Sequence, residues 1–322
     1  MTTDQADPAT AEALARVDAF LETHPGLTLE GVEQPRQGNT NRVFFARRGG
    51  QVVVLKVFCE PERKARECFG LRHWHATGLV SNLLWDADER MCMTSHLPGM
   101  SLGGSKLDEP AADWLAACRQ AGQAARLLTQ TPLSAPDRIT FESRFYRDVP
   151  TLEAYLRRIL DLGRGINARD ADFAGSFWRR SLDFIEAILP QILTQGTVLY
   201  HQDVGNLHVL GGRFIGFFDL EMCRVGCQAM QLGSAMVMAE GGNADWDAFR
   251  EGWESVGDPL TRDDRAATLA ARHLLGWREI SRYLSYDGTP GTGFDWASPA
   301  DPAWYHQRFE ECARLLEMKP AI

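Results

Sequence analysis

Apolar residues recur at two spacings along the chain, and the prevailing spacing changes near residue 100. Before that point, a helical pattern over residues 9–24 is followed by short apolar runs that lie between turn residues. Gly49 and Gly50 separate two of these runs, which is typical of a tight hairpin. A second helix is expected from Pro61 to Thr77, because proline suits a first helical turn and Gly78 suits a helix end. The runs predict strands over residues 27–32, 43–46, 52–58, 83–85 and 91–93.

Long helical patterns dominate after residue 105, and a strand-rich insert over residues 197–221 interrupts them. The patterns predict helices over residues 109–130, 149–163, 176–194, 231–240, 245–255, 262–285 and 302–317. We therefore predict an α+β protein with two lobes. Residues 1–98 form a small lobe built on an antiparallel sheet, and residues 99–322 form a larger, mostly helical lobe.

Composition and charge narrow the function classes. The chain has 322 residues, of which 44% are apolar and 24% charged, so long disordered tracts and coiled-coil rods are excluded. The formal net charge is −9, from 34 basic and 43 acidic residues. A protein that binds the phosphate backbone of nucleic acid needs a basic face, so we expect no nucleic-acid partner. The acidic balance favours a cationic or neutral small molecule.

The cellular compartment follows from what the sequence lacks. No apolar stretch is long enough to span a membrane, and the N-terminus has no secretory signal, so we expect no membrane association. The seven cysteines are scattered and form no C-x-x-C pair, so we expect small buried thiols rather than disulfides or a zinc site. A cytoplasmic protein is the prediction.

Residues 199–221 carry the candidate chemistry. Phosphoryl transfer requires a carboxylate near the acceptor hydroxyl and oxygen ligands for the magnesium ions that neutralise the phosphates. Asp203 is the candidate carboxylate, and Asn206 and Asp219 are candidate magnesium ligands. The hairpin expected between Asn206 and Asp219 would bring these two residues side by side.

This stretch resembles the aminoglycoside phosphotransferase and choline kinase family, small-molecule relatives of the protein kinases. The family signature is H-x-D followed by Asn, and later an Asp at the end of a strand; here the segments read HQDVGN and FFDLE. The resemblance implies a protein-kinase-like fold, ATP or GTP as donor, and Mg2+. It implies that Asp203 is the catalytic carboxylate, that His201 supports the catalytic loop, and that Asn206 and Asp219 hold the metal.

The sequence departs from the family in two places. The family usually has four residues between the Asp and the Asn, whereas this chain has two, and the longer spacing would put His208 in the asparagine's place. We favour Asn206, because its distance to Asp219 matches the family and His208 then falls inside a strand. Downstream, Cys227 and Gln231 replace aspartates that mainly brace the site. Glu221 either helps the site or caps the next segment.

The N-terminal half offers the partners that a kinase-like lobe should have. Lys56 lies in an apolar strand and is expected to contact the α- and β-phosphates, and Glu67 in the following helix is expected to pair with it. The turn at residues 37–41 is a candidate phosphate loop, with one glycine. The nucleotide-binding residues expected from this loop are Gly38, Asn39 and Thr40.

The segment that should hold adenine is Met91 to Gly99, with contacts from the backbone at Thr94 and His96. We therefore predict a phosphotransferase, either a monomer or a homodimer, that phosphorylates a hydroxyl of a small molecule. Candidate acceptors are an aminoglycoside or related antibiotic, choline or another amino alcohol, and a sugar. The competing hypothesis is a catalytically weak pseudokinase that binds a nucleotide or a partner. The shortened loop favours this alternative.

Overall fold

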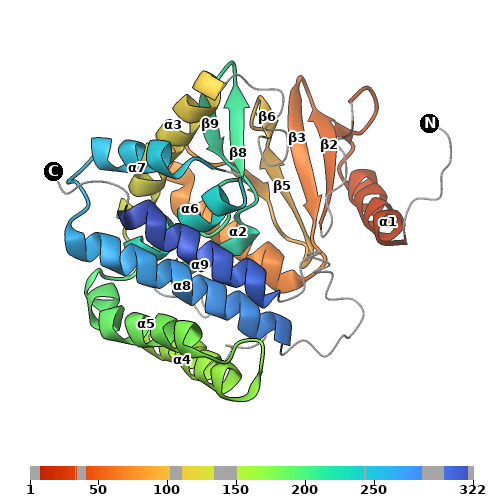
Figure 1. Cartoon of the computed structure of the whole chain (residues 1–322). Coiled ribbons are helices and arrows are strands. Elements are labelled where there is room, and N and C mark those ends of the chain that lie inside the picture. The colour runs from red at the N-terminus through yellow and green to blue at the C-terminus, as the bar shows by residue number, and fades with distance from the viewer. Residues whose placement is uncertain are drawn as a thin grey trace.

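The computed structural model describes residues 8–32, 34, 41–101, 111–133, 151–242, 244–284 and 301–317. A small sheet lobe and a larger helical lobe lie side by side (Figure 1). The first lobe contains α1 (Pro8–Thr23), β1 (Leu27–Thr28), β2 (Arg42–Arg48), β3 (Gln51–Val57), α2 (Pro61–Trp74), the 3-10 turn η1 (His75–Thr77), β4 (Leu83–Trp85) and β5 (Met91–Ser95). The helices of the second lobe are α3 (Ala111–Gln130), α4 (Leu152–Arg169), α5 (Ser176–Thr194), α6 (Gln228–Glu240), α7 (Trp246–Ser255), α8 (Arg262–Leu284) and α9 (Pro302–Glu317).

The first sheet is antiparallel, with strand order β1-β2-β3-β5-β4. Arg48 pairs with Gln51 across the Gly49-Gly50 turn, so the predicted hairpin is confirmed. The first predicted strand is shorter than expected, because it ends at Thr28 and the chain turns at Gly31, whose φ is 69°. Gly78 adopts φ 69° and ends η1 after α2, as predicted.

The two faces of this sheet are covered by different helices. Val53, Leu55 and Val57 of β3 share a hydrophobic cluster with α1 residues such as Val17. Alternate side chains of a strand point to opposite faces, so Lys56 faces the other side, toward α2. Burying each such aliphatic side chain stabilises the fold by roughly 1.5–3 kcal/mol, which fixes the register and with it the direction of Lys56.

Two short sheets connect the helices of the second lobe. β6 (Met100–Ser101), β8 (Leu207–Leu210) and β9 (Arg213–Phe217) form one, and β7 (Val198–His201) pairs with β10 (Cys223–Gly226) in the other. The predicted lobe boundary at residues 98 and 99 falls between β5 and β6. The Phe217 N–H donates to the Leu79 carbonyl at 2.9 Å, so a strand of the second lobe is tied directly to the segment after η1.

Helix packing explains two details that the sequence patterns did not predict. α4 continues to Arg169 although its predicted end was residue 163. Gly163 is buried there, and a Cβ at this position would lie 2.7 Å from Leu182 Cδ2 of α5, so the glycine serves close packing rather than a helix end. Likewise α3 and α7 cross where Gly122 and Gly252 leave room for backbone carbonyls.

The state of the cysteines and the apolar length of the helices can be compared with what the sequence predicted. Six of the seven cysteines are buried free thiols, as predicted, whereas the free thiol Cys59 is exposed because it lies in the bend between β3 and α2. Within the described ranges, no helix is long and apolar enough to cross a bilayer.

Candidate active site

Lys56 lies at the centre of a cluster of acidic side chains. Its ammonium group is 3.1 Å from Glu67 Oε2 and 3.9 Å from Glu221 Oε2, and it makes a direct ion pair with Asp219. Burial opposes the charged form of Lys56, but Asp219, Glu67 and Glu221 outweigh burial and raise its pKa well above the ordinary value. The lysine is therefore a fixed positive charge at the end of β3.

Glu67 reaches Lys56 because both belong to buried faces. Arg63, Glu67, Gly70 and Trp74 are buried along one side of α2, at the three- and four-residue spacing of a helix face. On this face Glu67 meets Lys56, while Gly70 lies against Leu220 and Cys223. The structure thus brings together the two residues that the sequence paired, while their roles toward a nucleotide stay predictions.

Asp219 lies just after β9 in an unusual backbone conformation. Its φ is 60° and its ψ is 53°, and it is the one non-glycine residue with positive φ in the described part of the chain. This left-handed residue turns the chain from β9 into η3 (Leu220–Met222). Burial alone would raise the pKa of the Asp219 carboxyl, but Lys56 outweighs burial and lowers it. Asp219 is therefore an ionised carboxylate.

The loop after β7 carries Asp203 and Asn206. The Asn206 N–H donates to the Asp203 carbonyl at 2.8 Å, and the Phe218 N–H donates to the Asn206 carbonyl at 3.3 Å. Asn206 therefore lies opposite the residue that precedes Asp219, so the hairpin brings the two candidate ligands side by side. His208 lies inside β8, and its ring packs edge-on against Phe218 at 4.7 Å. This placement matches the shortened loop.

Asp203 is half-buried in an acidic setting. Burial, together with the negative charges of Asp219 and Glu221, raises its pKa to about 7, although Arg224 and Arg278 act in the opposite direction. A carboxyl with a pKa near the working pH is suited to exchange a proton with a hydroxyl group.

His201 is fully buried, and its ring lies edge-on to Phe217 at 5.6 Å. Burial lowers the pKa of His201 to about 4, so the ring is neutral near pH 7. The backbone of His201 forms two hydrogen bonds with the Gln231 side chain, at 2.9 and 3.0 Å. Gln231 thus braces the loop, although it replaces an aspartate to which the family resemblance assigns that task. Next to it, Arg278 Nη1 donates to Gln202 Oε1 at 2.8 Å.

Glu221 was left open between two roles, and the structure shows it buried beside the cluster. Its Oε1 accepts from Arg63 Nη1 at 2.7 Å, and its Oε2 accepts from Asn41 Nδ2. Its carbonyl accepts from Arg66 Nε at 2.6 Å. Sequence reasoning missed both arginines. The signal that could have found them is a pair of positive charges on the same helix face as Glu67. A helix face that only packs against a core should be apolar.

The structure describes two of the remaining residues predicted to contact the nucleotide, Thr94 and His96. Gly38, Asn39 and Thr40 lie outside the described residues. Thr94 lies within β5 with β3 on one side and β4 on the other, pairing with Val54 and Leu83. Its backbone groups therefore belong to the sheet, which makes it a poor adenine contact. His96 follows the end of β5 and packs edge-on to Phe45 at 5.1 Å.

The candidate metal ligands fit magnesium by their chemistry. In the described part of the chain, no three His, Cys, Asp or Glu side chains are arranged to hold a metal by themselves. Magnesium at phosphate sites is usually bound by one or two carboxylates, with phosphate and water oxygens completing the shell. One carboxylate at Asp219 and one amide oxygen at Asn206 match that requirement.

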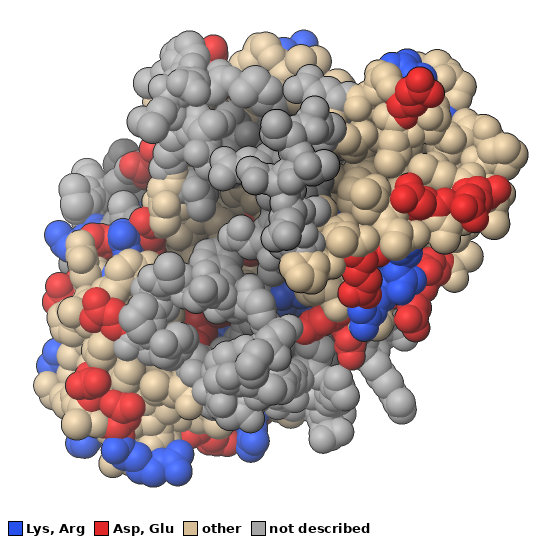
Figure 2. Space-filling model, turned by 90° about the vertical axis from the view of Figure 1, so that its right-hand side faces the viewer, with Lys and Arg blue, Asp and Glu red and all other residues tan. Residues whose placement is uncertain are grey.

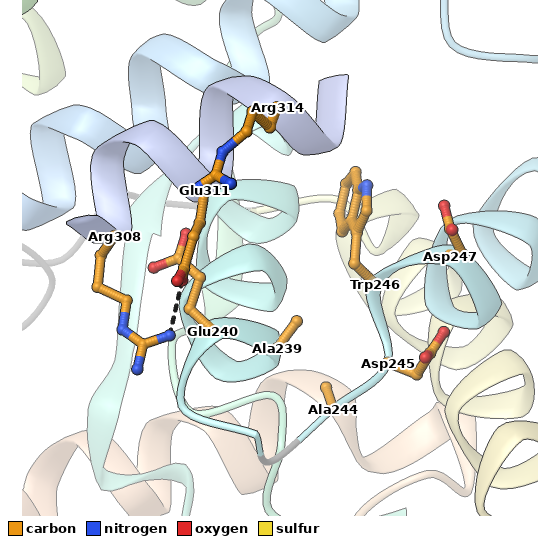
Figure 3. A pocket seen from close by; sticks show the side chains of 9 residues that line it. All are labelled: Ala239, Glu240, Ala244, Asp245, Trp246, Asp247, Arg308, Glu311 and Arg314. Atoms are coloured by element: carbon orange, nitrogen blue, oxygen red, sulfur yellow. Dashed lines mark hydrogen bonds and ion pairs between the residues drawn. The ribbon is translucent and has the colours of Figure 1, made fainter. Parts of the chain in front are cut away.

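A surface pocket of about 390 Å³ is lined by none of the residues of this site. It lies between the end of α6, the start of α7 and α9 (Figure 3). There, Arg308 pairs with Glu311 at 2.7 Å, and Trp246 lines the opposite side. On the face shown in Figure 2, the described basic residues lie among acidic ones and form no continuous basic surface.

Comparisons with solved structures show the same fold at low identity. Aminoglycoside phosphotransferase APH(4)-Ia superposes with a TM-score of 0.67 at 17% identity, covering 94% of this chain and 98% of that chain. A thermostable mutant of that enzyme, in a ternary complex with ADP and hygromycin B, gives 0.66 at 16% identity, covering 94% and 99%. Macrolide 2'-phosphotransferase MphH from Brachybacterium faecium gives 0.61 at 18% identity, covering 97% and 100%.

Sequence comparison places the chain in a family. No curated protein matched the sequence. The model of the phosphotransferase enzyme family matches residues 31–274. This range runs from before β2 into α8, and it includes Lys56 and the acidic residues around it, Glu67, Asp219 and Glu221. The match covers well over half of the chain and agrees with the two-lobed kinase-like architecture. The chain belongs to the phosphotransferase enzyme family.

Proposed function

We propose that the protein transfers the γ-phosphoryl group of ATP or GTP to a hydroxyl group of a small molecule. The observation that carries this proposal is the contact of Lys56 with both Glu67 and Asp219, residues separated by up to 163 positions in the sequence. Asn206 is held beside Asp219 by the β8–β9 hairpin. An ion-paired lysine, a metal-type aspartate and a nearby half-buried carboxylate are the groups that phosphoryl transfer requires.

Each residue has a defined task in this proposal. Lys56 binds the phosphates, and Glu67 keeps Lys56 directed toward them. Asp219 and Asn206 would hold magnesium, which supplies positive charge to the phosphates. Asp203 accepts the proton of the acceptor hydroxyl while the oxygen of that hydroxyl attacks the γ-phosphorus. The bond from that phosphorus to the bridging oxygen breaks, and the nucleoside diphosphate leaves. His201 and Gln231 hold the loop that carries Asp203.

The acceptor is proposed to be a cationic antibiotic or amino alcohol. Two solved structures with the same fold are described as an aminoglycoside phosphotransferase bound to hygromycin B and a macrolide 2'-phosphotransferase. The net charge of −9 favours attraction of a positively charged acceptor. Aminoglycosides and macrolides are therefore the first compounds to test, followed by choline, ethanolamine and sugars.

The first experiment asks whether a nucleotide binds. Melting temperature would be measured with ATP, GTP and their analogues, with and without Mg2+. A ligand present at a hundred times its Kd should add about 2.7 kcal/mol of stability. Nucleotide consumption would then be measured across the acceptor panel. Absence of any melting shift or binding heat at saturating nucleotide would contradict the proposal.

A nucleotide-binding pseudokinase is the second candidate, favoured by the short HQDVGN loop and by Cys227. The Asp203→Asn variant separates the two. In an enzyme, the variant should keep nucleotide affinity and lose about a hundredfold or more in turnover, because a general base is lost. In a pseudokinase, the wild-type protein should bind nucleotide without consuming it faster than this variant.

A further inference from the structure

Glu221 is a buried carboxylate to which the proposed reaction assigns no task. Its side chain is only 4% exposed. An ionised carboxylate is costly to bury unless hydrogen bonds and opposite charges compensate for the lost water. The groups that compensate here come from separate segments of the chain, so the side chain of Glu221 connects η3 to elements that are distant in sequence.

Both carboxylate oxygens of Glu221 are taken by N–H donors. Oε1 accepts from Arg63 of α2 at 2.7 Å, and Oε2 accepts from the side-chain amide of Asn41, which immediately precedes β2. Hydrogen bonds to an ionised carboxylate are stronger than neutral ones, and two donors fix the orientation of the group. Glu221 is therefore held in one position and in turn holds its donors.

The backbone around Glu221 extends the connection. The Glu221 carbonyl accepts from Arg66 Nε at 2.6 Å, which ties η3 to α2 a second time. Cys223 Sγ donates to the Arg66 carbonyl at 3.2 Å. α2 thus bonds at several points to the segment that directly follows Asp219. Because α2 also carries Glu67, the relative positions of Glu67 and Asp219 depend on these bonds.

Asn41 links Glu221 to the residues that lie between β3 and α2. It is 6% exposed, and its Oδ1 accepts from the Cys59 N–H at 3.4 Å. Its side chain therefore joins the segment after β3 to the carboxylate of Glu221. Asn41 is also the last residue of the segment predicted to form the phosphate loop.

We infer that Glu221 is a positioning residue that fastens Asn41 and α2 to the segment after Asp219, and thereby holds Lys56 and Asp219 in the arrangement that binds nucleotide phosphates. This inference rests on the proposed function. It assigns to Glu221, Arg63 and Asn41 an effect on nucleotide affinity that does not require contact with the acceptor.

The test is a donor–acceptor exchange between Asn41 and Glu221. The Kd for magnesium AMP-PNP would be measured by calorimetry on the full chain. Asn41→Asp places a carboxylate against Glu221, and Glu221→Gln removes the charge that Arg63 needs. Each should raise the Kd at least about tenfold. The double variant restores a matched donor and acceptor, and its Kd should return toward the wild-type value. Asn41→Ala removes the same donor without adding charge and replaces Asn41→Asp if the latter does not fold.

The matched control is Glu240→Gln. Glu240 pairs with Arg272 away from the cluster, and their side chains are 3% and 2% exposed, much like those of Glu221 and Arg63 at 4% and 6%. This control should lower the melting temperature and leave the Kd within about twofold.

Each outcome has one meaning. If the wild-type protein binds the nucleotide and the Asn41 and Glu221 variants bind it equally well, the inference is overturned and the proposed function stands. If the double variant binds as weakly as the worse single variant, the Asn41–Glu221 pairing is overturned. If the wild-type protein binds no nucleotide, the proposed function fails and the inference falls with it.

Discussion

Gln231 makes two hydrogen bonds with the backbone of His201: its Oε1 accepts the His201 N–H at 2.9 Å, and its Nε2 donates to the His201 carbonyl at 3.0 Å. Both residues are fully buried. An amide side chain can accept and donate at once, whereas a carboxylate can only accept. A glutamine therefore satisfies both groups of the residue that begins the loop carrying Asp203.

Replacing Gln231 by leucine should destabilise the protein by roughly 2–4 kcal/mol, because two buried backbone groups would lose their partners. Urea unfolding would measure this change. Gln123→Leu is the control, since Gln123 bonds to Ser255 at 3.0 Å on the surface, and it should change stability by less than about 0.5 kcal/mol. Equal stabilities of the two variants would contradict the bracing role.

The shortened loop leads to a ranking of two variants. Asn206→Ala should lower magnesium-dependent turnover about a hundredfold, because an oxygen ligand beside Asp219 is removed. His208→Ala should keep turnover within about threefold, since His208 packs on Phe218 from within β8. Turnover would be followed over a magnesium titration with the acceptor found in the screen. The reverse order would show that His208 occupies the ligand position.

The pKa of Asp203 predicts how turnover depends on pH. Burial raises this pKa to about 7, and only the deprotonated carboxylate accepts a proton. The value of kcat/KM reports on groups of the free enzyme, so it should rise with pH and level off above about 7. A profile that is flat between pH 5.5 and 8.5 would exclude Asp203 as the titrating base.

The same shift predicts a stability difference with a definite sign. An aspartate in an unfolded chain has a pKa of about 3.9, so between that pH and about 7 Asp203 holds a proton in the folded protein that it has lost in the unfolded chain. The contribution of Asp203 to the stability of the wild-type protein therefore falls as pH rises through this window. Asp203→Asn cannot ionise and should be more stable than wild type at pH 8, by roughly 1–3 kcal/mol. The difference should vanish near pH 4, which denaturant unfolding at both pH values would check.

Gly99 lies where the chain passes from the first sheet to β6. Its φ is 102°, and an added Cβ would overlap the Val209 carbonyl oxygen. Gly99→Ala should destabilise the protein by roughly 2–4 kcal/mol, from backbone strain and steric overlap together. Gly175 has a φ of 120°, and an added Cβ there would meet no atom within 4 Å, so Gly175→Ala isolates the strain and should cost about 1–2 kcal/mol. Thermal unfolding of both variants would separate the two contributions.

Local periodicity was enough to predict most elements and the direction of one functional side chain. The alternation in β3 puts Val53, Leu55 and Val57 on one face, which directs Lys56 to the other. The hairpin between Asn206 and Asp219 is also a local feature, because its strands are adjacent in sequence. These parts of the candidate site depend on residues close to one another along the chain, and the sequence alone determined them.

Only the tertiary structure decided which elements meet. Glu221 lies 180 positions from Asn41 and 158 from Arg63, and Gln231 lies 30 from His201. A buried charge on a helix face signals that a partner exists, but the pattern along one helix does not identify it. The partner is chosen by how α2, η3 and the sheet pack together, since that packing brings complementary donors and acceptors within hydrogen-bonding distance where no local spacing relates them.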